Sequence, residues 1–300
     1  MSLAGVHTRV ILATLFWGAN FVLAGPVLQE IPPLWAAALR FTLAALILLG
    51  LGLWRGTDLL APARAHAGVF VSIAAIGVVG FNLLFFWAMQ STSPTNGALI
   101  MATNPLMTTL IAFAVLAERP TFRQWLALPL AFVGVAVVIS HGDIHRLATF
   151  QFALGDLLML SANLAWAFYN VLCRRYMPAG SPLTNTTLVM IAGASLLLMV
   201  ALTSGESLSL PTVHAGVALL LMATAGTVLA YLFWMTGIAR LGAGRTSLFL
   251  NLVPVFAALI AALLGVAPTL AQVVGGLLVI GSVSVAMLPT QPSIRQTSRK

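Results

Sequence analysis

Charge is scarce in this sequence. Asp, Glu, Lys and Arg together account for 7% of the 300 residues, whereas hydrophobic residues account for 60%. A soluble domain of this size covers its core with a charged surface, and this composition is too poor in charge to supply one. The shortage of charge therefore excludes a water-soluble fold and predicts a chain that lies in a lipid bilayer.

Cysteine and the short motifs of enzymes are also missing or nearly so. Cys173 is the single cysteine, so an intrachain disulfide is excluded, and we expect this thiol to be buried. The sequence has no P-loop, no GxSxG motif and no HExxH motif. His141 and His145 have helical spacing but no third ligand beside them. The sequence thus predicts no enzyme, no metal site and no cofactor.

Acidic residues are few, and basic residues are dispersed. None of the six acidic residues lies in the middle of an apolar run, so a proton relay through buried carboxylates is not expected. The net charge of +8 is spread over one or two basic residues per loop, which is typical of membrane orientation and not of nucleic-acid binding. The expected partners are membrane lipid and a small-molecule substrate, with no nucleic acid, and a monomer is expected.

Ten apolar stretches of membrane-spanning length are present, and they predict ten transmembrane helices. They are expected at residues 9–29, 34–54, 67–89, 95–117, 121–140, 152–174, 183–204, 212–235, 246–265 and 269–288. The loops between them are too short to hold a separate domain. The predicted fold is an all-α polytopic membrane protein.

Lys and Arg residues predict the orientation, because they are enriched in cytoplasmic loops. With a cytoplasmic N-terminus, twelve of them face the cytoplasm and Arg146 alone faces the other side. We therefore expect a membrane protein with both termini in the cytoplasm, including a polar tail at 291–300. Arg40 falls inside a span, where it either reaches the nearer interface or binds a carboxylate in a cavity; the interfacial position is the expectation.

Two segments of the chain share one pattern. Residues 96–138 and 245–285 each contain an apolar run with an interior proline, a break with Pro-Thr, and a second apolar run with glycine. Their offset of 147 to 149 residues is half the chain length, which indicates duplication. Each half contains five spans, an odd number, so the second half enters the membrane from the opposite side. The sequence thus predicts inverted repeats at 1–143 and 150–290, with a site near the midplane between them.

Amide and aromatic side chains share a helical face in the first span of each half. Trp17, Asn20 and Phe21 do so in one half, and Asn163, Trp166, Tyr169 and Asn170 in the other. Trp17 and Trp166 are 149 residues apart. An unpaired amide is costly in a bilayer, so these faces should point into the bundle. They either line a site for a small polar ligand with an apolar side chain or hold helices together.

Other spans add candidates for the same site. They are Asn82, Phe86, Met101, Asn104, Tyr231, Trp234 and Asn251. Trp87 and Trp234, 147 residues apart, are matched between the halves in this interpretation. A stripe of aromatic residues and Met is also typical of plain packing.

Pro105 and Pro254 lie inside the fourth and ninth spans, where each removes a backbone hydrogen bond. Two interpretations remain open. The prolines either divide these spans into stiff segments with a hinge near the midplane, or they form static kinks.

The sequence resembles the EamA family of the drug/metabolite transporter superfamily. The resemblance rests on WGANF from Trp17, LRF at 39–41, TNPL from Thr103 with ERPT after it, and the glycine-rich last helix, and it spans about residues 8–288. It implies ten helices, inverted repeats, a location in the bacterial inner membrane and export of small metabolites. Within the family the chain is most similar to YddG-type exporters of aromatic and other neutral amino acids. One departure is Val266-Ala267-Pro268, where the family often has an acidic residue, so Glu118 has no counterpart in the second half.

The expected function is export of small neutral metabolites, in the first place aromatic or other apolar amino acids, by alternating access. Because no acid is expected at mid-membrane, transport is expected to need no proton gradient. Two alternatives remain: a broad-specificity metabolite or drug exporter with the same fold, and a membrane scaffold that does not transport.

Overall fold

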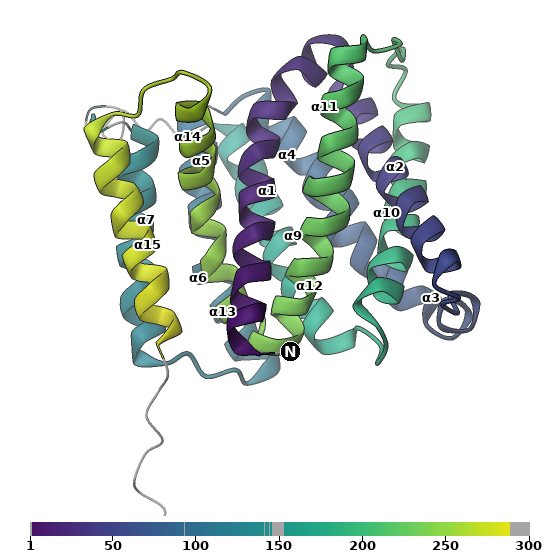
Figure 1. Cartoon of the computed structure of the whole chain (residues 1–300), viewed down its shortest axis with the longest axis horizontal. Helices are drawn as coiled ribbons and strands as arrows, with labels where there is room; N and C mark the ends of the chain where they lie inside the picture. Colours follow the sequence, from purple (N-terminus) through teal and green to yellow (C-terminus); the bar gives the residue numbers. More distant parts are fainter. Residues whose placement is uncertain (1, 93, 141, 144, 146–152, 289–300) are drawn as a thin grey trace, which may run out of the picture.

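The computed structural model describes residues 2–92, 94–140, 142–143, 145 and 153–288, apart from the side chains of residues 94–96. The regular elements within these residues are helices, and they form ten spans long and apolar enough to cross a membrane. Figure 1 shows them side by side in one bundle. The predicted all-α membrane fold is confirmed. His141, Arg146 and the expected tail at 291–300 lie outside the described residues.

The first half of the chain forms five spans, and its third and fourth spans are each composed of several elements. In order they are α1 (Leu3–Glu30), α2 (Pro33–Trp54), α3 (Leu60–Ala74) with the π-helix η1 (Ala75–Gly80) and α4 (Phe81–Met89), α5 (Pro94–Ala102) with α6 (Asn104–Leu116), and α7 (Phe122–Ser140).

The second half repeats this organisation. In order its elements are α9 (Leu154–Tyr176), α10 (Pro182–Thr203), α11 (Val213–Ala223) with the π-helix η2 (Thr224–Leu229) and α12 (Ala230–Leu241), α13 (Ala243–Ser247) with the 3-10 helix η3 (Leu248–Asn251) and α14 (Leu252–Leu263), and α15 (Leu270–Met287).

The predicted spans agree with the helices to within three residues, except at three ends. The first helix begins at Leu3 because the Ser2 hydroxyl accepts a hydrogen bond from the Gly5 amide at 3.3 Å. The third span begins at Leu60, but its backbone leaves the helical conformation at His66, so its regular part starts where predicted. The eighth span continues to Leu241, where Gly242 ends it with a φ of +91°.

The two π-helices identify equivalent positions in the two halves. η1 and η2 are offset by 149 residues, and each interrupts the third span of its half. In this register Trp234 corresponds to Phe85. The predicted match between Trp87 and Trp234 is therefore wrong, and the two side chains also differ in environment, since Trp87 is 48% exposed and Trp234 is 0% exposed.

The first helix of each half packs inside the other half. Helix α1 contacts α11, α12 and α14, whereas α9 contacts α4, α5, α6 and η1. An odd number of spans separates the starts of α1 and α9, so they cross in opposite directions. The candidate residues on these two helices therefore lie at the boundary between the halves.

The last helices of the two halves form a close pair. Helices α7 and α15 lie side by side at the left of Figure 1. A Cβ atom added at Gly134 would lie 2.9 Å from the carbonyl oxygen of Gly275, and one added at Gly275 would lie 2.6 Å from that of Gly134. Glycine at both positions lets the backbones approach this closely, which stabilises the pair through van der Waals contact.

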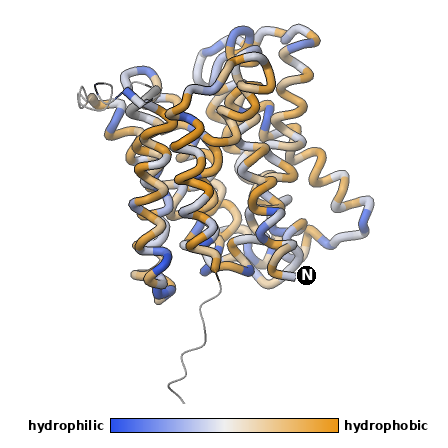
Figure 2. Tube along the Cα trace, turned by 60° about the vertical axis from the view of Figure 1, so that its left-hand side comes forward, coloured by the Kyte–Doolittle hydropathy of each residue, from blue (hydrophilic) through white to orange (hydrophobic). Residues whose placement is uncertain are grey.

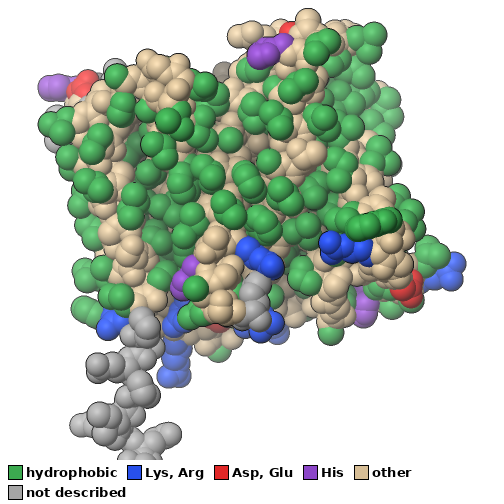
Figure 3. Space-filling model, viewed as in Figure 1, with side chains coloured by type: hydrophobic (Ala, Val, Ile, Leu, Met, Phe, Trp, Pro, Cys, Tyr) green, Lys and Arg blue, Asp and Glu red, His purple; other side chains and the backbone are tan. Residues whose placement is uncertain are grey.

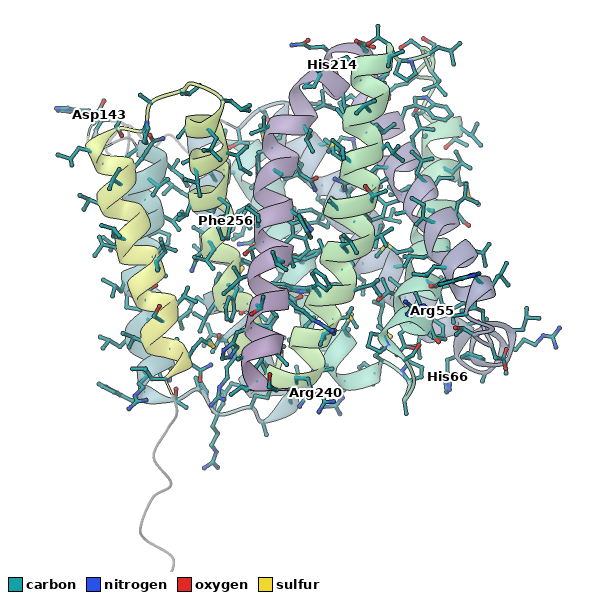
Figure 4. All side chains as sticks on the ribbon, in the orientation of Figure 1. Arg55, His66, Asp143, His214, Arg240 and Phe256 are labelled. Carbon is teal, nitrogen blue, oxygen red and sulfur yellow. The ribbon has the colours of Figure 1, made fainter. Side chains whose placement is uncertain are left out.

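The surface has the composition expected of a membrane protein. Hydrophobic residues lie along the length of the helices, and polar residues gather near the helix ends (Figure 2). In Figure 3 hydrophobic side chains cover the visible face, while Lys and Arg lie along its lower part, near the N-terminus. Figure 4 places Arg55, His66 and Arg240 toward this end, and Asp143 and His214 toward the opposite end. The described chain is thus a multi-pass membrane protein with a basic N-terminal end.

Candidate functional site

Five aromatic side chains meet at the boundary between the halves. We call them the central aromatic cluster: Trp17 of α1, Trp166 and Tyr169 of α9, and Tyr231 and Trp234 of α12. The Trp17 ring centroid lies 4.9 Å from that of Trp234, 5.6 Å from that of Trp166 and 5.9 Å from that of Tyr231. Trp166 stacks on Tyr169 at 5.0 Å. All five residues are among the predicted candidates.

Helical periodicity explains why these rings converge. Trp166 and Tyr169 are three residues apart, as are Tyr231 and Trp234, so each pair occupies one face of its helix. These four side chains are at most 5% exposed, while Trp17 is half-buried. The rings touch mostly edge to face or tilted, which is the favourable geometry for aromatic pairs. The cluster therefore combines a large apolar surface with a defined shape.

Two further rings extend the cluster, and sequence reasoning missed both. Phe81 lies 5.3 Å from Trp166, and Phe41 lies 6.1 Å from Tyr231. Phe41 belongs to the LRF motif and Phe81 precedes the predicted Asn82, so both had a neighbouring signal. The predicted Phe86 lies one step further out, because it contacts Phe85, which stacks on Phe81.

The π-helices fix α1 and α9 against the opposite half. The Trp17 indole N–H donates a hydrogen bond to the Gly226 carbonyl in η2 at 3.0 Å. A Cβ atom at Gly226 would lie 2.1 Å from Oδ1 of Asn20, and one at Gly77 in η1 would lie 2.0 Å from Cδ2 of Tyr169. Both the two glycines and the two side chains are 149 residues apart. In each half, a side chain from the other half thus packs against a π-helical glycine.

Amide groups at this site have unused hydrogen-bonding capacity. Oδ1 of Asn170 accepts a hydrogen bond from the Trp234 indole N–H at 2.8 Å. Nδ2 of Asn170 and Oδ1 of Asn20 are buried and have no hydrogen-bond partner within the described chain. Buried polar atoms without partners are rare and costly, so each of them calls for a partner such as a water molecule or a ligand. The cluster therefore borders one free amide donor and one free amide acceptor.

Arg40 does not occupy the interfacial position that the sequence led us to expect. Its guanidinium lies 4.6 Å from the centroid of the Phe41 ring, and its NH2 group donates to Oδ1 of Asn82 at 3.5 Å. Asn82 is itself held by a hydrogen bond from its Nδ2 to the Val78 carbonyl at 2.6 Å. Asn82 lies seven residues before Met89, where α4 ends, a distance of about 10 Å along the helix. The interfacial prediction is therefore wrong, and Asn82 keeps this charge inside the bundle.

Asn104 is part of a contact between helices and not of the cluster. Its Nδ2 donates to Oδ1 of Asn163 at 2.6 Å, and its Oδ1 accepts from the Thr108 hydroxyl at 3.0 Å. Asn163 in turn donates from Nδ2 to the Ile100 carbonyl at 2.7 Å, beside the break in the fourth span. Both amides are therefore satisfied by contacts among α5, α6 and α9, which corresponds to the alternative that these residues hold helices together.

Within the described residues, three other candidates make no hydrogen bond or ring contact with the cluster. Phe21 is 66% exposed, and it belongs to segment 19–24 of α1, which contains no fully buried residue because neighbouring helices cover it incompletely. Met101 is half-buried in α5. Asn251 is 3% exposed in η3, an element that packs against α1, α6 and α7. The predicted association of Phe21 with Trp17 and Asn20 is not found.

Both interior prolines follow a break in their span. Helix α5 ends at Ala102 and α6 begins at Asn104, directly before Pro105. The ninth span changes from α-helix to the 3-10 helix η3 and back again before Pro254. Each span therefore changes its helical geometry next to its proline, as both a hinge and a static kink would.

A polar cavity lies at the N-terminal end of the bundle. It has a volume of about 250 Å³, and its lining includes Glu118, Gln124 and four arginines, Arg119, Arg174, Arg240 and Arg245. Glu118, which follows α6, accepts a hydrogen bond from Nε of Arg174 at 3.3 Å, and NH1 of Arg174 donates to the Ala239 carbonyl at 2.7 Å. The two halves are thus connected through an ion pair at this end.

The family model described as "EamA-like transporter family" matches this chain twice, over residues 7–140 and over residues 153–288. The chain belongs to the EamA-like transporter family. The two matches coincide with the two five-span halves of this EamA protein. The resemblance of the sequence implied such a pair of repeats.

Curated relatives of this EamA protein are named as transporters. The uncharacterized transporter YyaM of Bacillus subtilis (strain 168) is 39% identical over 277 residues, which cover 92% of this chain and 91% of the relative. A protein of Chlamydia trachomatis named as an S-adenosylmethionine/S-adenosylhomocysteine transporter is 26% identical over 203 residues, covering 65% and 61% of the two chains. Together with the ten spans, these similarities identify the chain as a membrane protein of a transporter family.

A solved crystal structure has the same fold. It superimposes with a TM-score of 0.81 at 22% sequence identity, and the match covers 96% of this chain and 98% of the other. This likeness concerns the arrangement of the helices, which is therefore shared over nearly the whole length of both chains.

Proposed function

We propose that this EamA protein is a secondary transporter that exports small neutral metabolites, with aromatic and other apolar amino acids as its main substrates. The observation that carries the proposal is the central aromatic cluster at the boundary between the halves, beside the free Oδ1 of Asn20 and the free Nδ2 of Asn170. The rings offer faces to an apolar side chain, and the amides offer hydrogen bonds to a polar backbone. The resemblance of the sequence to YddG-type exporters implies the same substrate class.

Transport would proceed by alternating access around this cluster. Contacts between the halves exist at both ends of the bundle. At the N-terminal end, Glu118 pairs with Arg174. At the opposite end, Glu30 accepts hydrogen bonds from the amide and the hydroxyl of Thr212, both at 2.7 Å. In our proposal these contacts open in turn, and the basic N-terminal end faces the cytoplasm of a bacterial inner membrane.

The two prolines are proposed to be the hinges of this movement. Replacing Pro105 with Ala restores a backbone N–H and stiffens the span, so we expect transport to slow by about tenfold, equal to about 1.4 kcal/mol in the barrier. Pro254→Ala is expected to act in the same direction. Pro129→Ala is the matched control, since Pro129 lies inside the uninterrupted helix α7. Transport rates in proteoliposomes test the prediction, and equal rates for all three variants and the unmodified protein would rule out the hinge.

Proteoliposomes also test the function itself. Purified protein is reconstituted, loaded with one unlabelled amino acid of a panel of twenty, and exposed to the labelled form without a proton gradient. We expect saturable counterflow for phenylalanine, tryptophan or tyrosine. This transport should need no proton gradient, because no acidic residue lies near the middle of a described span. Strict dependence on a proton gradient would contradict facilitated diffusion.

Two other outcomes identify the alternatives. Equal transport of many unrelated metabolites would indicate a broad-specificity metabolite or drug exporter, a possibility to which the S-adenosylmethionine-transporting relative draws attention. No saturable transport of any compound would indicate a membrane scaffold. Trp87→Ala serves as a control for protein handling, since Trp87 lies in α4 with 48% of its surface exposed.

A further inference from the structure

Arg40 carries a charge inside the bundle for which the described residues supply no counterion. The six acidic residues of the chain lie at or beyond helix ends: Glu30, Asp58, Glu118, Asp143, Asp156 and Glu206. Within the described residues, the polar contact of the guanidinium is a neutral one, to Oδ1 of Asn82 at 3.5 Å. Nε of Arg40 is buried and has no hydrogen-bond partner there. Since arginine stays protonated in proteins, its positive charge has no opposite charge beside it among the described residues.

The position of Arg40 connects it to the central aromatic cluster. Its guanidinium lies over the ring of Phe41, and the Phe41 ring is 6.1 Å from that of Tyr231, a member of the cluster. Helix α2, which carries Arg40, also packs against η2, the π-helix that receives the Trp17 hydrogen bond. A small molecule with its apolar part on the cluster therefore has this cation within the same region of the interface between the halves.

We propose that Arg40 binds the carboxylate of the transported substrate. This inference rests on the proposed function and narrows it: the substrate combines an apolar or aromatic body with a carboxylate, and molecules without the carboxylate are poor substrates. A guanidinium pairs with carboxylates through parallel N–H donors, and its Nε is one of the donors that the protein leaves unused. Charged residues inside membrane spans typically mark substrate pathways, with a partner of opposite charge.

A structural role is the competing explanation. In that case Arg40 holds Asn82 and covers Phe41, and its replacement disturbs packing for every ligand alike. The two explanations differ in ligand selectivity: loss of a carboxylate site affects ligands with a carboxylate and spares those without one.

The test measures binding of three ligands that share a phenyl ring to the purified full-length protein. L-phenylalanine has a carboxylate and an ammonium group, 3-phenylpropanoate has the carboxylate alone, and phenethylamine has the ammonium group alone. For the unmodified protein we expect both carboxylates to bind at least about tenfold more tightly than phenethylamine. In Arg40→Gln, affinity for both carboxylates should fall by about 10- to 100-fold, with phenethylamine unchanged.

Further variants and a control keep the result decisive. Arg40→Lys retains the charge for folding but loses the paired donors, so an intermediate loss of about tenfold is expected. Arg64→Gln, at an exposed position of α3, should bind all three ligands as the unmodified protein does. If phenylalanine and phenethylamine bind the unmodified protein equally, the carboxylate site is wrong while the transport proposal stands. If none of the three ligands binds, the proposed amino-acid specificity fails and the carboxylate site fails with it.

Discussion

Replacing Trp166 with Ala is expected to abolish measurable transport. Its ring touches Trp17, Phe81, Tyr169 and Tyr231, so it joins α9 to helices of both halves. Removing a buried Trp side chain costs about 3–5 kcal/mol of stability in soluble proteins, and loss of a central aromatic contact weakens ligand binding by at least about tenfold. Trp166→Ala should therefore reduce both thermal stability in detergent and the transport rate in proteoliposomes.

A milder variant and a control separate these two effects. Trp166→Phe keeps an aromatic ring and most of the apolar volume, so we expect the protein to fold while its affinity for aromatic substrates falls. Trp87→Ala removes an equally large side chain from a position that is 48% exposed, and it should leave transport nearly unchanged. If Trp166→Ala and Trp87→Ala have the same transport rate, the central aromatic cluster does not form the substrate site.

Gly77→Ala is expected to destabilise the protein strongly. The new Cβ atom would lie 2.0 Å from Cδ2 and 2.6 Å from Cβ of Tyr169. Because the Cβ of Tyr169 is fixed to the backbone, relief requires α9 to move away from η1, and such overpacking costs about 1–3 kcal/mol or more. The displacement also disturbs the stacking of Tyr169 on Trp166. Thermal denaturation in detergent and counterflow measure the two consequences.

The second π-helix supplies the comparison. At Gly226 the new Cβ atom meets the terminal amide of Asn20, which can rotate, so Gly226→Ala should be less destabilising than Gly77→Ala. Gly68→Ala and Gly216→Ala are controls, since no heavy atom lies within 4 Å of the added Cβ at either helical position. A gain of up to about 1 kcal/mol is expected there from the better helix former. Equal stability of Gly77→Ala and Gly68→Ala would show that η1 and α9 are not packed as described.

Hydropathy was enough to predict the spans because the bilayer demands nearly the same length of apolar helix each time. The inverted arrangement followed from five spans per half. The register between the halves was harder. Matching Trp87 with Trp234 used two similar side chains 147 residues apart, while the equivalence of the structure runs through Gly77 and Gly226, at 149. Both halves contain the π-helical turn at the same position, so the turn leaves the offset unchanged, and hydropathy does not show where it lies.

The candidate site was predictable where one straight helix decided it. Spacing along α9 placed Trp166, Tyr169 and Asn170 on one face, and the structure has them so. Prediction from spacing failed where a neighbouring helix determines the contacts of a side chain. Asn104 is satisfied by Asn163 across an interface that spacing within one span cannot show. The same holds for Arg40, whose location depends on Asn82 of α4.

The exchange of α1 and α9 between the halves has a consequence for the ancestry of such proteins. A single five-helix half leaves its own first helix without the neighbours that cover it, since these belong to the opposite half. An ancestor of half the length would have needed a second copy inserted upside down in the same membrane. Fusion of the two genes would then have fixed one insertion direction for each copy. After that, the side chains that pack on Gly226 and Gly77 were free to diverge, one into the amide of Asn20 and the other into the phenol of Tyr169.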